Sequence, residues 1–195
     1  HVMRGGREGW KLGRSPKVED YMMTNLQDMT CGLFMVQTSD ELCKRKGVTR
    51  EEIDEFAALS HARTTASIEN DVFEQEIVPV TVKSRRSETV ITHKDEDHVV
   101  KNTTAESLSK LPTAYGPESF VTAGNASGLN DGATAALLAS EDKAKEVGLT
   151  IKAKLVSYAF AGVEPEIMGY GPVPSTLKAL KQAGLKIEDI GAFEI

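Results

Sequence analysis

The stretch of sequence richest in groups for binding or catalysis is TAGNASGLNDGA, from Thr122 to Ala133. Three glycines, two asparagines, a serine and an aspartate lie in it, directly before the apolar run TAALLAS. Glycine adopts backbone angles that other residues avoid, and asparagine and aspartate side chains bind nearby backbone groups. The stretch is therefore either a tight turn between core elements or a loop shaped to hold a ligand.

The spacing of this glycine-rich stretch excludes three common motifs for phosphate binding or catalysis. No lysine follows the glycines, as GxxxxGK[ST] requires, and Gly124, Gly128 and Gly132 do not fit GxGxxG. The residue two positions before Ser127 is not a glycine, so Ser127 is not the nucleophile of a GxSxG elbow. Spacing alone favours a structural turn and leaves the ligand-binding loop as the alternative.

The cysteine and histidine side chains form no pattern typical of a metal site. Cys31 and Cys43 form no CxxC motif, and the four histidines include no HExxH pair. We therefore expect no bound metal. We expect both cysteines to be small apolar residues in a reducing, cytoplasmic compartment. His61 is expected to be a surface or half-buried residue rather than a base.

The composition is that of a soluble globular protein with one large or two small domains. The 195 residues are 40% hydrophobic and 27% charged, and the net charge is −6. The negative charge argues against nucleic acid as a partner, and no apolar run approaches the roughly 20 residues of a membrane helix. The basic cluster from Lys83 to Arg86 is expected to form a solvated hairpin tip, with an anion site as the alternative.

Two helices that would precede the glycine-rich stretch can be read from their ends and periodicity. One is expected from Ser39, with that residue or the one before it as N-cap, to about Lys46. The other begins after Thr49, because Thr49 and Glu52 have the spacing of a capping box. We expect Asp54 to point away from the apolar face of this second helix. That face is expected to consist of Ile53, Phe56, Ala57 and Ser60.

Strand patterns occur on both sides of a change of composition near Tyr115. The β-branched runs 76–82 and 88–93 predict a hairpin. Beyond Tyr115, the apolar or alternating runs 133–140, 151–160 and 190–195 predict strands, the first buried on both faces. Helix patterns follow Ser140 and cover 173–184, so the second half alternates strands and helices.

Four longer segments carry a resemblance to a known family. VTAGNASGLNDGATAALL and GVEPEIMGYGPVPSTLKALKQAGL resemble the thiolases, in particular the biosynthetic acetoacetyl-CoA type. REEIDEFAALSHARTTAS and FEQEIVPVTVK resemble the loop domain of that family, so the similarity spans almost the whole chain. The resemblance implies an α/β thiolase-like fold. Residues 1–115 would form a loop (lid) domain over the coenzyme A site, and residues 116–195 the start of the C-terminal half.

The resemblance also implies a set of substrate contacts. The serine of GNASG, here Ser127, would hydrogen-bond the pantetheine arm of coenzyme A. Small residues would let this narrow arm approach the backbone. Many biosynthetic thiolases carry a histidine where this chain has Phe34, so substrate preference is open. The other coenzyme A contacts would be Ala123, Tyr115, Met35, Leu26 and Phe34, and Met168 would line the acyl pocket.

The catalytic elements of the family find no match in this sequence. Thiolases use a nucleophilic cysteine, an acid/base cysteine, the histidine of Gly-His-Pro and the asparagine of Asn-Glu-Ala-Phe. We therefore expect part of an acyltransferase that condenses or cleaves acyl-CoA and acetyl-CoA, inactive as these 195 residues alone. The resemblance implies coenzyme A and acyl-CoA as substrates, no tightly bound cofactor, and a homodimer or homotetramer. The alternatives are a non-catalytic coenzyme A-binding module or an assembly fragment.

Overall fold

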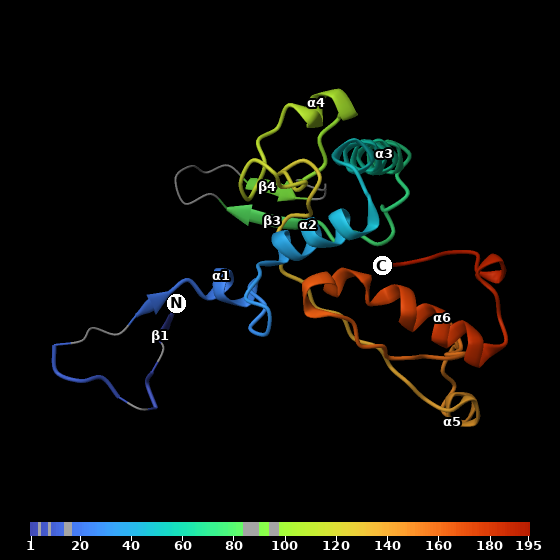
Figure 1. Ribbon diagram of the computed structural model, residues 1–195. Coiled ribbons are helices and arrows are strands. Elements are labelled where there is room, and N and C mark those ends of the chain that lie inside the picture. The colour runs from blue at the N-terminus through green and yellow to red at the C-terminus, as the bar shows by residue number, and fades with distance from the viewer. Residues whose placement is uncertain (4, 8, 14–16, 84–89, 94–97) are drawn as a thin grey trace. The chain divides into compact units, whose positions relative to one another are not determined.

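The computed structural model describes residues 1–3, 5–7, 9–13, 17–83, 90–93 and 98–195 (Figure 1). These residues form two compact units. The central unit is Cys43–Gly128, and the split unit combines His1–Leu42 with Leu129–Ile195. The predicted hairpin tip from Lys83 to Arg86 falls almost wholly outside the described residues.

The helices and strands are short in both units, apart from three longer helices. The helix α2 (Met35–Lys46) crosses from the split unit into the central unit. The rest of the central unit contains α3 (Arg50–Glu69), β3 (Val80–Lys83), β4 (Val90–His93) and α4 (Ala105–Ser109). The rest of the split unit contains β1 (Val2–Met3), β2 (Val18–Glu19), α1 (Tyr21–Asn25), α5 (Glu141–Glu146), the 3-10 helix η1 (Pro165–Tyr170), α6 (Pro172–Ala183) and the 3-10 helix η2 (Ile187–Asp189).

The longest element, α3, begins at the capping box that the sequence predicts. The Thr49 hydroxyl accepts a hydrogen bond from the Glu52 N–H at 3.2 Å, and the Thr49 N–H donates to Glu52 Oε2 at 2.8 Å. These bonds give partners to the backbone N–H groups of Thr49 and Glu52, which would otherwise be unpaired at the start of the helix. The accepted hydrogen bond stabilises the charged Glu52 carboxylate, which lowers its pKa.

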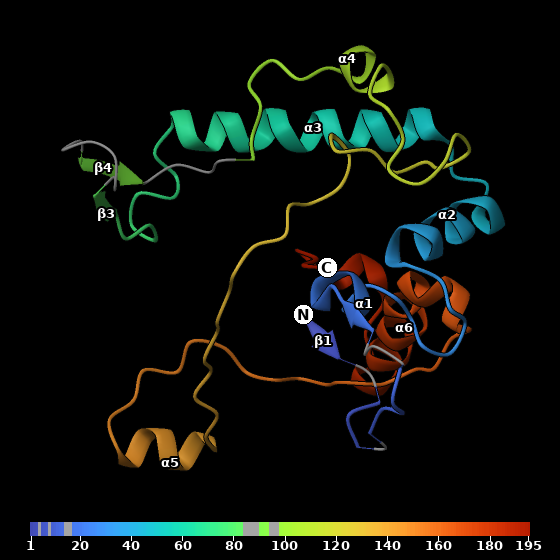
Figure 2. The same ribbon diagram turned by 90° about the vertical axis from the view of Figure 1, so that its left-hand side faces the viewer.

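The face of α3 that is shielded from solvent mixes apolar and polar side chains. The prediction is correct for Ile53 and Ala57 and wrong for Phe56 and Ser60, which are exposed. Asp54 is 1% exposed, whereas Phe56 is 72% exposed, so the expectation that Asp54 points away from the packed face is wrong. Asp54 is buried because Arg50 and Asn125 bind its carboxylate, as described below. The helix α4 packs beside α3 (Figure 2). The shielded residues recur at helical spacing: Arg50, Ile53, Asp54, Ala57, Ala58, His61, Thr64, Thr65, Ser67 and Ile68.

Two further expectations for the first half can be compared with the structure. The hairpin is confirmed, because β3 and β4 pair antiparallel with Val80 opposite His93 and Lys83 opposite Val90. The helix α2 begins at Met35, before the predicted start at Ser39. The earlier start is possible because the side chain of Gln37 accepts the Phe34 N–H at 3.0 Å, a bond that the sequence pattern does not reveal.

The two helices predicted in the second half are confirmed. Ser140 caps α5 by accepting the Lys143 N–H at 3.3 Å, and the first turn of α5 is acidic. The helix α6 has a proline in its first turn and ends at Gly184, whose φ of 68° is left-handed. The start of α5 and both ends of α6 therefore follow the capping rules from which they were predicted.

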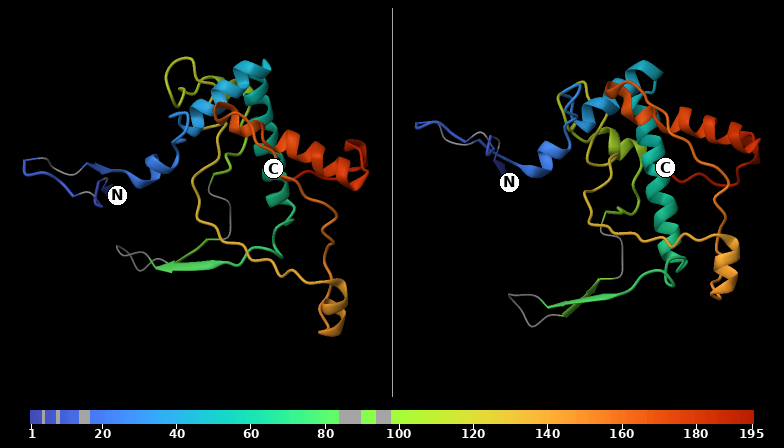
Figure 3. Two further views of the ribbon diagram at one scale, coloured as in Figure 1. Left: turned by 60° about the horizontal axis from the view of Figure 1, so that its bottom comes forward. Right: turned by 90° about the horizontal axis from the view of Figure 1, so that it is seen from below.

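The three strands predicted in the second half are not formed, and this expectation is wrong. Residues 133–140, 151–160 and 190–195 have no regular secondary structure, and the chain runs extended on both sides of α5 (Figure 3). Leu137 and Leu138 are 79% and 80% exposed. A strand buried on both faces needs neighbours at its edges and covering layers. The described residues supply neither to Leu137 and Leu138.

One of these segments still shows strand-like alternation. Ser157 and Ala159 are half-buried, whereas Tyr158 and Phe160 are exposed. The shielded side lies against α6, where the Ser157 hydroxyl donates to the Ala179 carbonyl at 2.9 Å. The period of two that predicted the strand is therefore real, although no partner strand pairs with this segment among the described residues.

The predicted boundary at 115/116 does not coincide with the division into compact units. Thr113 and Thr122 form an antiparallel bridge, and the Ala114 N–H donates to the Val121 carbonyl at 2.8 Å. The glycine-rich stretch up to Gly128 therefore packs with the helices that precede it. In the described part of the chain, no helix combines the length and apolar character of a membrane span.

The capping box predicts how stability responds to loss of the cap. Thr49→Ala should lower the free energy of unfolding by about 1 kcal/mol, because a backbone N–H at the start of α3 loses its acceptor. Chemical denaturation measures this change. Thr150→Ala, at an exposed site, is the matched control and should have a smaller effect. Equal losses in the two variants would contradict a stabilising cap.

Candidate functional site

The glycine-rich loop from Thr122 to Gly128 is held in a compact turn by its own side chains. Thr122 is fully buried, and its N–H donates to Asn125 Oδ1 at 2.7 Å. The Thr122 hydroxyl accepts the Gly124 N–H at 3.2 Å. These bonds correspond to the turn that the residue types predict.

The same loop is joined to α3 through two polar side chains, the half-buried Asn125 and the buried Asp54. Asn125 Nδ2 donates to Asp54 Oδ1 at 2.9 Å and to the Phe120 carbonyl at 3.0 Å. The second oxygen of Asp54 accepts Arg50 Nε at 2.7 Å, and Arg50 Nη2 donates to the Leu108 carbonyl at 2.8 Å. The structure therefore shows more than a turn, because the loop, α3 and the end of α4 share one hydrogen-bonded network.

The predicted contact residues of the central unit lie on or beside this loop. Ala123 and Ser127 are exposed, and Tyr115 is 49% exposed. Tyr115 follows the short pairing of Ala114 with Val121, which places its backbone next to the start of the loop. The structure thus presents these three residues to solvent from one unit, as ligand contacts require.

Two glycines of the loop allow close packing that a larger residue would prevent. A Cβ atom on Gly124 would lie 2.4 Å from a methyl of Leu108 and 2.6 Å from one of Leu111. A Cβ atom on Gly128 would lie 2.4 Å from Nε2 of His98. His98 was not predicted at this site, and nothing in its sequence surroundings indicates that its ring lies against Gly128.

The predicted contact residues of the split unit cluster around a second turn. Gln27 and Phe34 form an antiparallel bridge, and the Met35 N–H donates to the Leu26 carbonyl at 2.9 Å. Leu26, Phe34 and Met35 are half-buried. The structure therefore brings these three predicted residues together within their own unit.

An aspartate shapes the turn between Leu26 and Phe34. Asp28 Oδ1 accepts the N–H groups of Thr30 at 2.7 Å and Cys31 at 2.9 Å. These bonds, that from Cys31 first, lower the pKa of Asp28 below its ordinary value of 3.8 by stabilising the charged form. The turn is thus held by a carboxylate in its ionised state.

The remaining predicted residue, Met168, is 48% exposed in η1. The 3-10 helix η1 packs against α2 in the same unit, since a Cβ atom on Gly169 would lie 3.2 Å from a methyl of Leu42. Met168 therefore stands on an element that contacts the helix beginning at Met35.

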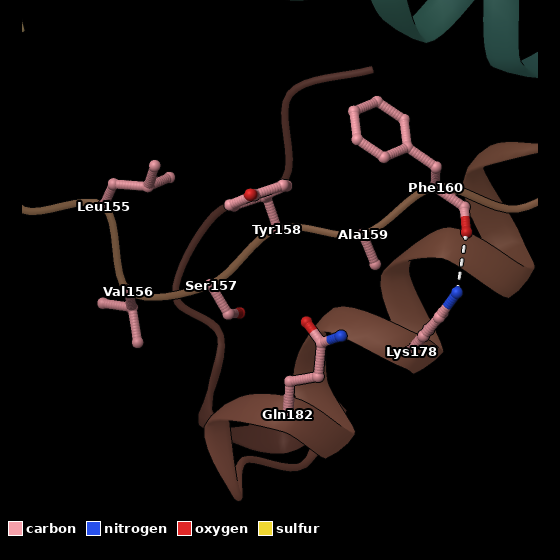
Figure 4. Close-up of a pocket in the computed structure, with 8 residues that line it drawn as sticks. All are labelled: Leu155, Val156, Ser157, Tyr158, Ala159, Phe160, Lys178 and Gln182. Atoms are coloured by element: carbon pink, nitrogen blue, oxygen red, sulfur yellow. Dashed lines mark hydrogen bonds between the residues drawn. The ribbon is translucent and has the colours of Figure 1, made fainter.

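A cavity elsewhere in the split unit contains none of the predicted residues. It has a volume of about 530 Å³ and lies between α6 and the extended segment from Leu155 to Phe160 (Figure 4). The amine of Lys178, on its wall, donates to the Phe160 carbonyl at 3.1 Å. Ligand sites combine an enclosed volume with polar groups that are available to the ligand. This groove is open to solvent, and two of its polar side chains, Ser157 and Lys178, already bind backbone carbonyls. The glycine-rich loop remains the better candidate.

The structure offers no metal centre in the residues that it describes. No group of three histidine, cysteine or acidic side chains is close enough to hold an ion there. Both cysteines are free thiols, Cys43 buried at 9% exposure on α2 and Cys31 half-buried in the Asp28 turn.

Comparison with models of known protein families shows the family to which the chain belongs. The model of the thiolase N-terminal domain matches residues 1–142, and the model of the thiolase C-terminal domain matches residues 149–195. The chain therefore belongs to the thiolase family, as its motifs predicted.

Individual relatives agree with this assignment. An acetyl-CoA acetyltransferase from Pseudomonas aeruginosa is 43% identical over 194 residues, which cover 100% of this chain and 49% of that protein. The crystal structure of human mitochondrial 3-ketoacyl-CoA thiolase matches with a TM-score of 0.85 at 39% identity, over 97% of this chain and 47% of that one. The same human enzyme in complex with CoA matches with a TM-score of 0.83 at 39% identity, over 97% and 46% of the two chains.

Two conclusions follow from these relatives. The fold class is confirmed, because the solved structures that match are thiolases of mixed α/β architecture. The chain spans about half the length of the relatives that it matches.

The close packing at the two glycines predicts different costs for the same substitution. Gly124→Ala should lower the free energy of unfolding by about 1–3 kcal/mol, because Leu108 is buried and must be displaced. Gly128→Ala should cost clearly less, because the exposed ring of His98 can turn away. Denaturant titration of both variants checks the order. A larger loss for Gly128→Ala would contradict it.

The Asp28 turn predicts a dependence of stability on acid. A lowered pKa means that Asp28 stabilises the folded state above its ordinary pKa of 3.8 and loses this contribution as the pH falls through the lowered value. Asp28→Asn should therefore flatten the fall in unfolding midpoint below about pH 4. Denaturation midpoints across that range measure the effect.

Proposed function

We propose that this chain provides coenzyme A-binding residues of a thiolase that catalyses reversible condensation or thiolysis between acyl-CoA and acetyl-CoA. The observation that carries the proposal is the exposed Ser127 on a loop that Asn125 joins to the buried Asp54, in a chain of the thiolase family. The match to a thiolase structure in complex with CoA supports it further.

The proposed contacts follow from the chemistry of the pantetheine arm. This arm is a narrow chain with two amide groups, so it needs small neighbours and a few well-placed hydrogen-bonding groups. Ser127 offers a hydroxyl that donates and accepts, and Ala123 leaves room beside it. Tyr115 supplies aromatic surface. Apolar contacts would come from Leu26, Phe34 and Met35, and Met168 would line the acyl pocket.

We assign no catalytic role to the cysteines of this chain. A nucleophilic cysteine works as an accessible thiolate in a polar surrounding. Cys43 is buried on α2, and Cys31 is half-buried in the Asp28 turn. In the proposed reaction a cysteine outside residues 1–195 attacks acyl-CoA, takes the acyl group and releases coenzyme A. A base removes a proton from acetyl-CoA. The resulting enolate attacks the acyl-cysteine thioester, which releases the cysteine.

The proposal extends to cofactors, partners and location. Coenzyme A and acyl-CoA act as substrates, and no tightly bound cofactor is proposed. The resemblance to thiolases supports a homodimer or homotetramer. The free thiols of Cys31 and Cys43 support a reducing, cytoplasmic compartment.

Substitution of the proposed contact tests this function. In the full-length protein, Ser127→Ala should raise KM for acyl-CoA about fivefold, because a hydrogen bond of about 1 kcal/mol is lost. The fold should change little, since Ser127 is exposed. Steady-state kinetics and a thermal melt measure both. Ser60→Ala, an exposed serine of α3, is the control. An unchanged KM for Ser127→Ala would remove Ser127 from the site.

A further inference from the structure

We infer that Asn125 and Asp54 are positioning residues that hold the glycine-rich loop in the shape that presents Ser127 to pantetheine. The inference rests on the proposed coenzyme A site. It concerns residues that touch the loop and one another, with no contact of their own to the substrate.

Both the oxygen and the nitrogen of the Asn125 side-chain amide form hydrogen bonds inside the protein. Its oxygen accepts the Thr122 N–H at 2.7 Å, and its nitrogen donates to Asp54 Oδ1 at 2.9 Å and to the Phe120 carbonyl at 3.0 Å. Aspartate cannot donate these two bonds, and alanine makes none of the three. Because Asn125 lies two residues before Ser127, its fixation limits where the serine hydroxyl can be.

Asp54 anchors the side chain of Asn125 to α3. Asp54 is 1% exposed, so each oxygen of its carboxylate needs a partner inside the protein. Asn125 binds one oxygen, and Arg50 Nε binds the other at 2.7 Å. Arg50 in turn donates to the Leu108 carbonyl. A buried charge with both oxygens engaged has little freedom, which makes it a fixed reference point for the loop.

Packing at Gly124 fixes the loop on one side of Asn125, because Gly124 lies against the buried side chain of Leu108. On the other side, Gly128 lies against the exposed ring of His98, which restrains the loop less. Beside these positions, Ala123 and Ser127 remain exposed. The loop is thus held at Gly124 and Asn125 while its small and hydroxyl side chains stay open to a ligand.

A loop fixed in advance improves binding because the ligand need not order it. If Asn125 is removed, Ser127 keeps its hydroxyl but must find its bound position during the binding event. The loss should then appear in KM for acyl-CoA. A purely structural link would instead lower the melting temperature and leave KM unchanged.

A double-mutant cycle in the full-length protein tests this role. Asn125→Ala, Ser127→Ala and the double variant are compared by KM and kcat for acyl-CoA and by thermal melting. Asn125→Ala should raise KM about as much as Ser127→Ala, roughly fivefold, and the double variant should be little worse than either single one. Independent effects that multiply to about 25-fold would overturn the inference, as would an unchanged KM for Asn125→Ala.

The cycle separates this inference from the proposed function. If Ser127→Ala leaves KM unchanged, the coenzyme A site is wrong. If Ser127→Ala raises KM but Asn125→Ala does not, only the positioning role is wrong.

Two further variants sharpen the test. Asn125→Asp keeps the shape but places a second carboxylate beside Asp54 and the Phe120 carbonyl, so KM should rise more than for Asn125→Ala. Asn102→Asp is the matched control and should leave KM unchanged. Asn102 is exposed, and aspartate also accepts its φ of 61°.

A milder variant covers the case in which Asn125→Ala fails to fold. Arg50→Lys keeps a positive charge beside Asp54 but lacks the forked geometry that reaches both Asp54 and Leu108. It should raise KM about twofold, and this rise should vanish when Ser127 is already alanine. The same rise in both backgrounds, or no rise in either, would overturn the inference.

Discussion

The structure of the central unit depends on one buried charge, the carboxylate of Asp54. Burying a carboxylate is unfavourable unless each oxygen is hydrogen-bonded, and here Arg50 and Asn125 meet that requirement. The two partners come from the start of the same helix and from a loop far along the chain. Because Arg50 also binds the Leu108 carbonyl, satisfying a single charge fixes α3, α4 and the glycine-rich loop together.

The sequence was informative at most places where structure depends on neighbours along the chain, with the early start of α2 as an exception. The capping box of Thr49 and Glu52, the Ser140 cap of α5 and the left-handed Gly184 after α6 all follow from local hydrogen bonding and backbone angles. The β3–β4 hairpin is equally local. The thiolase family could be identified from four motifs for a related reason, since long runs of specific residues leave little room for coincidence.

Predictions were wrong where a residue's state depends on distant partners. Periodicity assigned Asp54 to an outer face because it is charged, and nothing near it in the sequence shows that Asn125 binds it. The apolar run at 133–140 has a strand pattern, but pairing needs neighbouring strands that the described residues do not supply. For the candidate site, the residue types could suggest Ser127 as a ligand contact. The contacts of Asn125 and His98 are evident only in the three-dimensional structure.

The two fixed points of the loop, Gly124 and Asn125, have a consequence for its length. Each meets a partner on a different part of the unit, so one residue added or removed at this place would break at least one of these contacts. A peptide tag inserted here would accordingly separate Ser127 from the side chain that positions it.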